Sequence, residues 1–252
     1  MSWARRKKTT YISIIFLFFL IIFLIFVVVF FSKTATCSDN IQNQEEVGID
    51  CGGPCSNLCR AEYSDPNILW VRWSKVLISG TYNVLAYVEN PNIESGSYNV
   101  PYSFKIYDKL GVLLFEKYGS TYIPPSKNFA VFEDGINIGD KVPFRIDFKF
   151  TSSSTWQNIE SKELQISSNA AISKEDSKPR VDASLTNKTL KPIYNIEVIA
   201  ILYDSDGNTI AFSRSKVDKI DGEGIEKVTF TWPESFAKKV YKVETVSKVL
   251  GN

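Results

Sequence analysis

Four cysteines and several oxygen-bearing side chains share one short stretch, Thr36 to Arg60, of this 252-residue chain. An even number of cysteines in a short exported segment is typical of two disulfides. Four cysteines allow three pairings, and the sequence does not choose among them. The spacing of the last three would fit a helix, but the intervening Gly52, Gly53 and Pro54 favour a tight loop. The cysteines are Cys37, Cys51, Cys55 and Cys59.

A zinc site with four cysteine ligands is the alternative interpretation. Thirteen residues separate Cys37 from Cys51, and no Cys-x2-Cys pair occurs. Structural zinc sites commonly take their ligands in such close pairs. The spacing therefore favours disulfides over zinc.

Oxygen donors in the same stretch could bind Ca²⁺, a hard cation that takes six to eight oxygen ligands. A second interpretation is that these acids and amides only solvate a small module with almost no core. The sequence leaves both interpretations open. The candidate ligands are Asp39, Asn43, Glu46 and Asp50.

The stretch resembles a small cysteine module of exported prokaryotic proteins, with the pattern C-x-D-x3-N-x2-E-x-G-x-D-C-G-G-x-C. Asn40 stands where that module usually has Gly. Because Asn also tolerates a positive φ, we expect the loop to fold in the same way. The matching residues are Cys37, Asp39, Asn43, Glu46, Gly48, Asp50, Cys51, Gly52, Gly53 and Cys55.

The chain contains no histidine. Its absence removes Ser-His-Asp and Cys-His nucleophile systems, together with the imidazole ligands common in zinc enzymes. Carboxylate pairs of the glycosidase type would remain, but one sequence does not reveal their geometry. We therefore predict no catalytic residues and a protein that is not an enzyme; a carboxylate-based enzyme is the least favoured alternative.

The element that positions the cysteine segment is an apolar run from Tyr11 to Phe31 with no charge, Gly or Pro. As a helix it is roughly 32 Å long, which matches a bilayer core of about 30 Å. The run therefore predicts a single-pass membrane helix that contacts lipid. It carries no intramembrane charge, so we expect a tether rather than a conduit.

Basic residues in the leading segment 1–10 set the expected topology. Positive charge stays in the cytoplasm, so everything from Ser32 onward should lie outside it. A cleaved signal peptide is the alternative, but its apolar region is usually shorter, and Thr34-Ala35-Thr36 is a poor cleavage site. The basic residues are Arg5, Arg6, Lys7 and Lys8.

Short runs rich in Val, Ile, Phe, Tyr and Trp, separated by turn residues, follow the cysteine segment. This spacing is typical of β-sandwiches, so the fold class is mainly β. We predict a cysteine-rich module at 36–60, a first sandwich at 67–166, a polar linker at 167–179 and a second sandwich at 180–250.

The two β-rich blocks look like copies. Tyr98-Asn99-Val100 recurs as Tyr194-Asn195-Ile196, 96 residues later, and Asn90 corresponds to Asn187. A D-x-x-G step recurs at the same offset. Such agreement predicts two tandem domains of one fold. The repeated turn residues are Asp108 and Gly111 in the first copy, and Asp204 and Gly207 in the second.

Asp204-Ser205-Asp206-Gly207 also resembles the start of an EF-hand loop. Strands flank it instead of helices, however, and the sixth and twelfth positions are Thr209 and Ser215 rather than Gly and Glu. Since both copies keep only the Asp and the Gly, we predict hairpin turns.

The second copy resembles the FxLYD domain family at Leu202-Tyr203-Asp204, a Leu-Tyr-Asp step before a D-x-x-G turn. The first copy carries the weaker Ile106-Tyr107-Asp108. The resemblance implies an immunoglobulin-like sandwich outside the cytoplasm and brings no catalytic residues. The whole arrangement resembles prokaryotic single-pass membrane proteins.

Aromatic residues are abundant, with 17 Phe, 12 Tyr and 5 Trp. Exposed ones could form a carbohydrate or protein contact patch, while packing in the cores or between domains is the plainer interpretation. The residues in question are Trp70, Trp73, Tyr122, Trp156 and Trp232.

The function is predicted from the domain architecture and from the lack of a recognisable catalytic arrangement in the sequence. With 29 basic and 28 acidic residues, the chain gives no reason to expect nucleic acid as a partner. The leading hypothesis is a non-enzymatic, membrane-anchored binding or scaffold protein that presents its sandwiches to a protein or envelope partner. The alternative is a subunit of an envelope assembly of the secretion or pilus-related kind.

Overall fold

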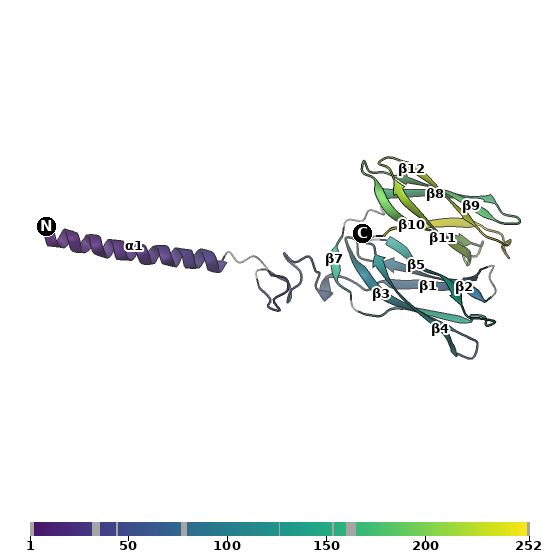
Figure 1. Cartoon of the computed structure of the whole chain (residues 1–252), viewed down its shortest axis with the longest axis horizontal. Helices are drawn as coiled ribbons and strands as arrows, with labels where there is room; N and C mark the ends of the chain where they lie inside the picture. Colours follow the sequence, from purple (N-terminus) through teal and green to yellow (C-terminus); the bar gives the residue numbers. More distant parts are fainter. Residues whose placement is uncertain are drawn as a thin grey trace. The chain divides into compact units, whose positions relative to one another are not determined.

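The computed structural model describes residues 3–31, 36–43, 45–76, 80–125, 127–152, 154–159 and 165–250, with the side chains of 3–9, 30 and 31 outside that description. The chain divides into two compact units, Met1–Ser56 and Asn57–Asn252. The first holds a helix and a disulfide loop, and the second holds all the β-strands of the described residues (Figure 1).

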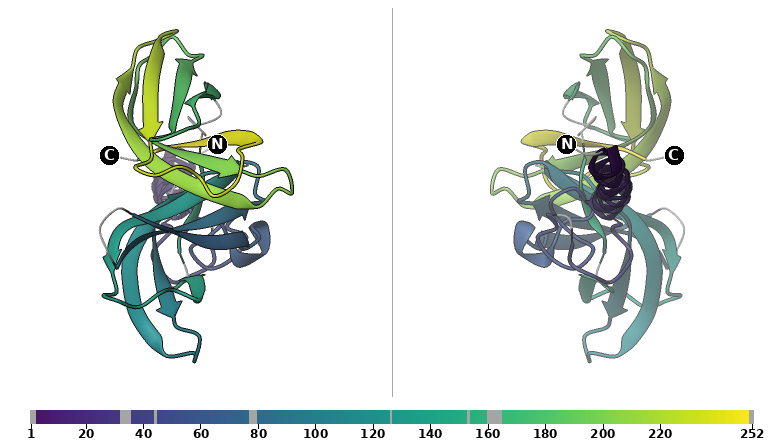
Figure 2. Two further views of the ribbon diagram at one scale, coloured as in Figure 1. Left: turned by 90° about the vertical axis from the view of Figure 1, so that its right-hand side faces the viewer. Right: turned by 90° about the vertical axis from the view of Figure 1, so that its left-hand side faces the viewer.

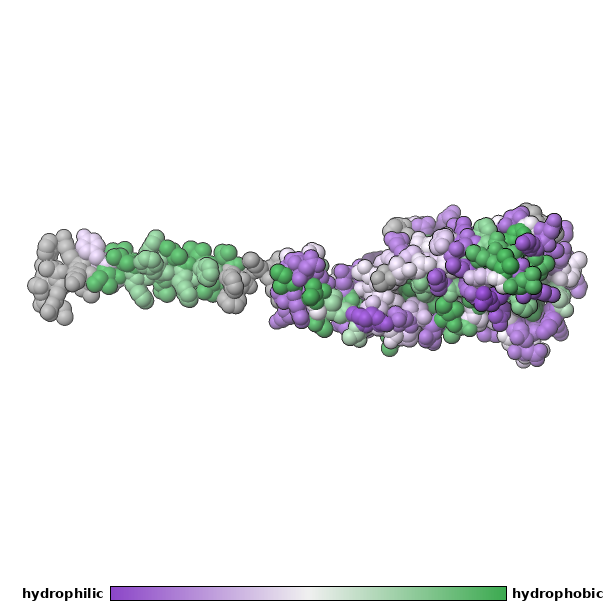
Figure 3. Space-filling view, turned by 90° about the horizontal axis from the view of Figure 1, so that it is seen from below, coloured by the Kyte–Doolittle hydropathy of each residue, from purple (hydrophilic) through white to green (hydrophobic). Residues whose placement is uncertain are grey.

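Helix α1 spans Trp3–Phe31. Within it, Thr10–Val29 is long and apolar enough to cross a membrane, and none of that stretch is buried against the rest of the protein. Figure 3 shows its apolar surface exposed. An apolar helix of this kind is either a membrane anchor or a signal sequence. The side chains of Arg5, Arg6, Lys7 and Lys8, on which the predicted topology depends, lie outside the described residues.

The second unit contains two β-sandwiches built from antiparallel sheets (Figure 2). A 3₁₀ turn, η1 (Arg60–Glu62), precedes the first sandwich. One of its sheets has the order β1 (Asn67–Lys75), β2 (Thr81–Asn90), β5 (Lys127–Asn137). The other has the order β4 (Leu113–Ile123), β3 (Ser95–Tyr107), β6 (Arg145–Phe150), and β7 (Trp156–Asn158) pairs with β3.

The second sandwich has two three-stranded sheets. One has the order β12 (Ile225–Thr231), β9 (Arg180–Asn187), β8 (Ile166–Lys174). The other has the order β11 (Thr209–Ile220), β10 (Ile193–Tyr203), β13 (Lys242–Val249). Each sandwich encloses its own apolar core, so the predicted fold class, β-sandwich domains behind one helix, is confirmed.

The predicted linker at 167–179 is wrong over most of its length. Residues 166–174 form strand β8, which pairs along its length with β9, and Ile172 packs against the second core. The segment is polar because β8 is an edge strand, and only one of its faces meets the core. The second sandwich therefore begins near Ile166, not near Arg180.

The two copies share backbone geometry as well as sequence spacing. Asn99 and Asn195 both have positive φ, at 52° and 54°. Gly111 and Gly207 both have φ of 79° in their hairpin turns, where a side chain would be strained.

The buried Asn residues also match. The amide of Asn90 donates to the carbonyl oxygens of Ser95 and Pro124, at 2.8 and 2.7 Å. The amide of Asn187 donates to the carbonyl oxygens of Lys191, Ile220 and Asp221, at 2.8, 3.3 and 3.0 Å. Each amide thus satisfies backbone carbonyls near the strand ends of its own sandwich. Asn187 begins an Asn-x-Thr glycosylation sequon, but its side chain is fully enclosed in the fold.

A third apolar cluster joins the two sandwiches. It lies between the β1-β2-β5 sheet and the β11-β10-β13 sheet, which face one another (Figure 1). Strands β2 and β10 are consequently buried on both faces: Leu85 and Ile201 point into this cluster, while Val84 and Ala200 point into the cores of their own sandwiches. The sandwiches are packed sheet to sheet, not strung along a linker. The full cluster is Leu85, Tyr87, Ala130, Phe132, Ile199, Ile201, Tyr203, Phe212 and Val246, with Trp70 against it.

Candidate functional site

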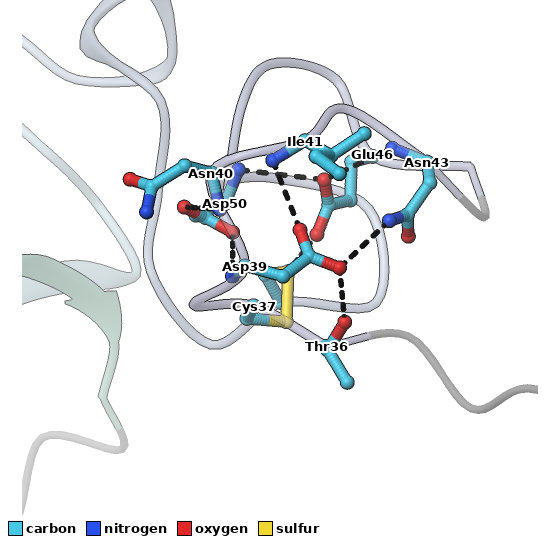
Figure 4. Close-up of a disulfide and its surroundings, with 9 residues drawn as sticks. Thr36, Cys37, Asp39, Asn40, Ile41, Asn43, Glu46 and Asp50 are labelled. Carbon is cyan, nitrogen blue, oxygen red and sulfur yellow. Dashed lines mark hydrogen bonds between the residues drawn. A yellow bond between two sulfur atoms is a disulfide. The ribbon is translucent and has the colours of Figure 1, made fainter.

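The cysteine segment folds as a disulfide loop. Cys37 and Cys55 are bonded, with their Cα atoms 5.6 Å apart (Figure 4). Cys51 and Cys59 are disulfide-bonded as well. The prediction of disulfides is therefore confirmed. The loop is tight, as the glycines indicated: Gly53 has φ of 58°, and a Cβ there would lie 2.2 Å from a backbone oxygen.

The acidic side chains of this loop accept hydrogen bonds from its backbone (Figure 4). The Asp50 carboxylate accepts from the N–H groups of Asp39 and Asn40, both at 2.9 Å. Asp39 accepts from the Ile41 N–H at 2.9 Å and from the Asn43 amide at 3.0 Å. Asn40 has φ of 59°, the conformation expected for Asn in place of Gly. The acids therefore act as internal caps for a loop that has little core.

The four predicted Ca²⁺ ligands do lie together in this loop. Glu46 is buried, and its Oε2 accepts from the N–H groups of Asn43 and Asp50, both at 3.3 Å. Glu46 also lies beside the sulfur atoms of Cys37 and Cys55, but these sulfurs are bonded to each other and are not available as thiolate ligands. Hydrogen bonding from Thr36 is the main cause that lowers the pKa of Asp39. Calcium binding stays a prediction.

A polar pocket of about 440 Å³ opens in the second unit, beside the apolar cluster that joins the sandwiches. Strands β3, β4 and β5 of the first sandwich and β10, β11 and β13 of the second contribute its walls. Pockets of this size are typical of small-molecule sites. Its polar lining consists of Tyr98, Asn99, Tyr102, Ser120, Thr121, Tyr122, Glu133, Glu197, Arg214 and Lys248.

A buried ion pair forms one wall of the pocket. Glu197 on β10 and Lys248 on β13 are direct cross-strand neighbours, and each is only 6% exposed. Lys248 Nζ lies 3.1 Å from Glu197 Oε2, in an ion pair that lacks directed hydrogen-bond geometry. The same ammonium donates across the interface to Thr121 Oγ1 at 3.1 Å and to the Ala130 carbonyl at 3.3 Å. Lys248 thus connects both sandwiches.

Arg214 on β11 extends this charge network. Its guanidinium lies 2.5 Å from Asp134 of the first sandwich and 3.5 Å from Glu197 of the second. It also covers the ring of Phe132, 4.8 Å from the centroid. The arginine therefore forms a second polar contact across the interface, and its stacking on Phe132 restricts the position of the guanidinium group.

Glu133 on β5 faces the pocket from the first sandwich. Its Oε1 accepts a hydrogen bond from the Tyr102 hydroxyl at 2.8 Å, and its Oε2 lies 3.9 Å from Lys117 Nζ. Burial raises the pKa of Tyr102, and the hydrogen bond to Glu133 raises it further. The tyrosine therefore remains a protonated donor and holds the carboxylate in place.

Two tyrosines form an aromatic surface on the pocket. The rings of Tyr98 and Tyr122 stack with centroids 4.8 Å apart and an interplanar angle of 14°. A β-bulge produces this stack, because Tyr98 and Asn99 together oppose Tyr122 between the pairs Ser97–Ile123 and Val100–Thr121. Bulges re-aim side chains in this way.

The aromatic residues singled out in the sequence divide between packing and surface. Trp156 is 3% exposed and stacks on Tyr63, and Trp70 stacks on Tyr87 beside the inter-sandwich cluster. The packing interpretation is thus correct for these two tryptophans. Trp232 also packs against the core of the second sandwich, and together with Trp73 it lines a second pocket of about 360 Å³. Tyr122 instead lines the polar pocket.

The turn residues perform the structural role predicted for them. Asp108 Oδ1 accepts from the N–H groups of Leu110 and Val112, both at 2.9 Å. Asp204 Oδ1 accepts from the N–H groups of Asp206 and Asn208 at 3.0 and 2.8 Å. The hairpin interpretation of the EF-hand-like stretch is therefore confirmed.

Sequence reasoning missed Glu133, Glu197, Arg214 and Lys248. One signal was available: Glu197 is a lone charge within the otherwise apolar run 196–203 of strand β10. A charge in a strand buried on both faces needs a partner. The partners come from other strands, and their pairing is not visible in one sequence.

Comparisons with known proteins do not identify a family for this chain. No protein-family model matches the chain, and no curated protein matches it. Among solved structures, a red sea bream transglutaminase is 9% identical with a TM-score of 0.25, over 74% of this chain and 32% of that one. A β-glucuronidase of glycoside hydrolase family 2 is 12% identical with a TM-score of 0.25, over 86% of this chain and 27% of that one. The chain spans only those shares of the two enzymes, and likeness at this level carries no argument.

Proposed function

We propose that this chain is a non-enzymatic binding protein, anchored in the cell membrane by α1, that presents its paired sandwiches outside the cytoplasm to a protein or envelope partner. The inter-sandwich cluster is the observation that carries this proposal. It buries side chains from both sandwiches, including Leu85 and Ile201 at 0% exposure. An apolar contact between two sheets holds the domains together, so that both can contribute to one binding surface.

The disulfide loop supports the proposed location, since disulfides persist in oxidising compartments outside the cytoplasm. The exposed apolar side chains of α1 support the anchor, because a helix of twenty predominantly apolar residues is stable in lipid and not in water. The charges of the polar pocket support binding over catalysis: Glu197 is paired with Lys248 and Arg214, and Glu133 accepts from Tyr102.

Protease digestion of intact cells tests the location. A chain tagged after Asn252 should lose its tag to external protease, while a fragment that contains α1 stays with the membrane. A tag that survives until the membrane is opened would refute the proposed topology.

Replacement of α1 by an unrelated apolar helix tests the role of the anchor. If the helix is only a tether, the surface level and the partner binding of the exported part stay unchanged. Loss of binding with normal surface level would instead favour the envelope-assembly alternative, in which the helix itself contacts partners.

A further inference from the structure

We infer that the polar pocket between the sandwiches is a binding site for neutral polysaccharide chains. This inference rests on the proposed function, and it specifies the ligand of the exported part. The site has three features that together select this chemistry: balanced charge, both donors and acceptors of hydrogen bonds, and an aromatic surface.

Balanced charge argues for a neutral ligand. Two carboxylates, Glu133 and Glu197, and two cations, Arg214 and Lys248, line the pocket. An anionic ligand would be attracted by the cations and repelled by the carboxylates. A cationic ligand would be attracted by the carboxylates and repelled by the cations. Lys248 already has three oxygen neighbours within 3.3 Å, so its charge is engaged within the protein.

Polar groups of opposite kinds favour hydroxyl groups as ligand atoms. Glu133 uses Oε1 to accept from Tyr102, while Oε2 lies 3.9 Å from its nearest cation, beyond hydrogen-bond distance. The side chain is 16% exposed, and it can therefore accept from a ligand hydroxyl. Asn99 and Ser120 in the same lining offer both donors and acceptors. A hydroxyl group both donates and accepts, so this lining suits polyhydroxylated molecules.

The aromatic surface suits the apolar face of a sugar ring. Tyr98 is 47% exposed, and its ring is held by stacking on the ring of Tyr122. A rigid ring with a polar tip provides contact area at low cost in conformational entropy. The second copy lacks this surface: its equivalent residue, Tyr194, lies across from Lys219 instead of a tyrosine.

The test is saturation-transfer NMR with the full chain in lipid nanodiscs, free of sugar-based detergent. The probes are neutral hexasaccharides of β-1,4-glucose, β-1,4-N-acetylglucosamine and α-mannose, with hexagalacturonate as the charged comparison. At least one neutral probe should bind, and hexagalacturonate should bind at least about tenfold more weakly. The inference is overturned if no neutral probe binds, or if the charged probe binds equally well.

Two variants test whether the probe binds in this pocket. Tyr98→Ala removes the aromatic surface, and Glu133→Gln removes the carboxylate while it keeps an acceptor for Tyr102. Each should weaken binding by about tenfold or more, and the matched control Tyr194→Ala, 51% exposed in the wild-type protein, should leave binding unchanged. Unchanged binding in both pocket variants, with thermal unfolding equal to wild type, would overturn the site. A negative NMR result together with a protease-accessible C-terminus would remove the ligand class and leave the proposed location intact.

Discussion

Substitution of Lys248 by Met should strongly destabilise the paired sandwiches. The change leaves the Glu197 carboxylate in a site with 7% side-chain exposure, and its remaining cation, Arg214, is 3.5 Å away. It also removes the donor to Thr121 and Ala130. At 3.1 Å and an effective dielectric of about 20, the lost Coulomb attraction is about 5 kcal/mol. Removal of one partner from a buried ion pair typically costs about 3–5 kcal/mol.

Lys242→Met is the matched control, because it makes the same change on the same strand. Lys242 pairs with Glu244 at the same 3.1 Å, but the lysine side chain is 62% exposed. An exposed pair is worth about 0–1 kcal/mol because water screens both charges. The two ion pairs therefore have the same N–O distance and differ in burial, and Lys248 also donates to Thr121 and Ala130.

Urea denaturation of the detergent-solubilised chain, followed by tryptophan fluorescence, measures both effects. Trp70 contacts the inter-sandwich cluster and reports on its opening. The double variant Glu197→Leu with Lys248→Met should be more stable than Lys248→Met alone, because it removes the unpaired buried charge. If Lys248→Met costs no more than Lys242→Met, or if the double variant is the least stable, the buried ion-pair argument is wrong.

Three further predictions follow from other contacts. Leu85→Ala should cost about 2–5 kcal/mol by urea denaturation, and it should speed amide hydrogen exchange in β10 as well as in β2, because Leu85 packs in the cluster between the sandwiches. Asn187→Ala should cost about 1–3 kcal/mol by the same assay, because three backbone carbonyls, of which that of Ile220 is buried, lose their donor. Asp204→Asn should make the free energy of unfolding depend less on pH in the acid range. Hydrogen bonding from Lys238 lowers the pKa of Asp204 from 3.8 to about 2. The carboxylate therefore stabilises the fold above about pH 4, and this stabilisation is lost as the pH falls toward 2.

Each of these three has a clear contrary result. Faster exchange confined to β2 in the Leu85 variant would mean that the sandwiches are not coupled through the cluster. An Asn187 variant as stable as wild type would mean that water replaces the amide. If the free energy of unfolding falls equally with acid in wild type and Asp204→Asn, Lys238 does not lower the pKa of the Asp204 carboxyl group in solution.

Local patterns were sufficient for much of the architecture. The uninterrupted apolar run predicted the helix, because its length and composition need no partner to be recognised. The Asp and Gly steps predicted the hairpins, because a turn depends on the φ of one or two residues. The spacing of repeated residues predicted two domains of one fold. The even cysteine count predicted disulfides, although not their pairing.

Tertiary structure decided what lies between the sandwiches. Strand β8 was mistaken for a linker, because an edge strand needs few apolar residues. The continuous apolar runs in β2 and β10 are typical of strands buried on both faces, but a sequence does not say which sheet covers the second face. The polar pocket depends on this packing: Glu133, Glu197, Arg214 and Lys248 lie on four strands and two domains, and only the facing of two sheets brings their charges together. Local sequence patterns therefore predicted most of the strands, and the contact between the two sandwiches is what brings those four charges together.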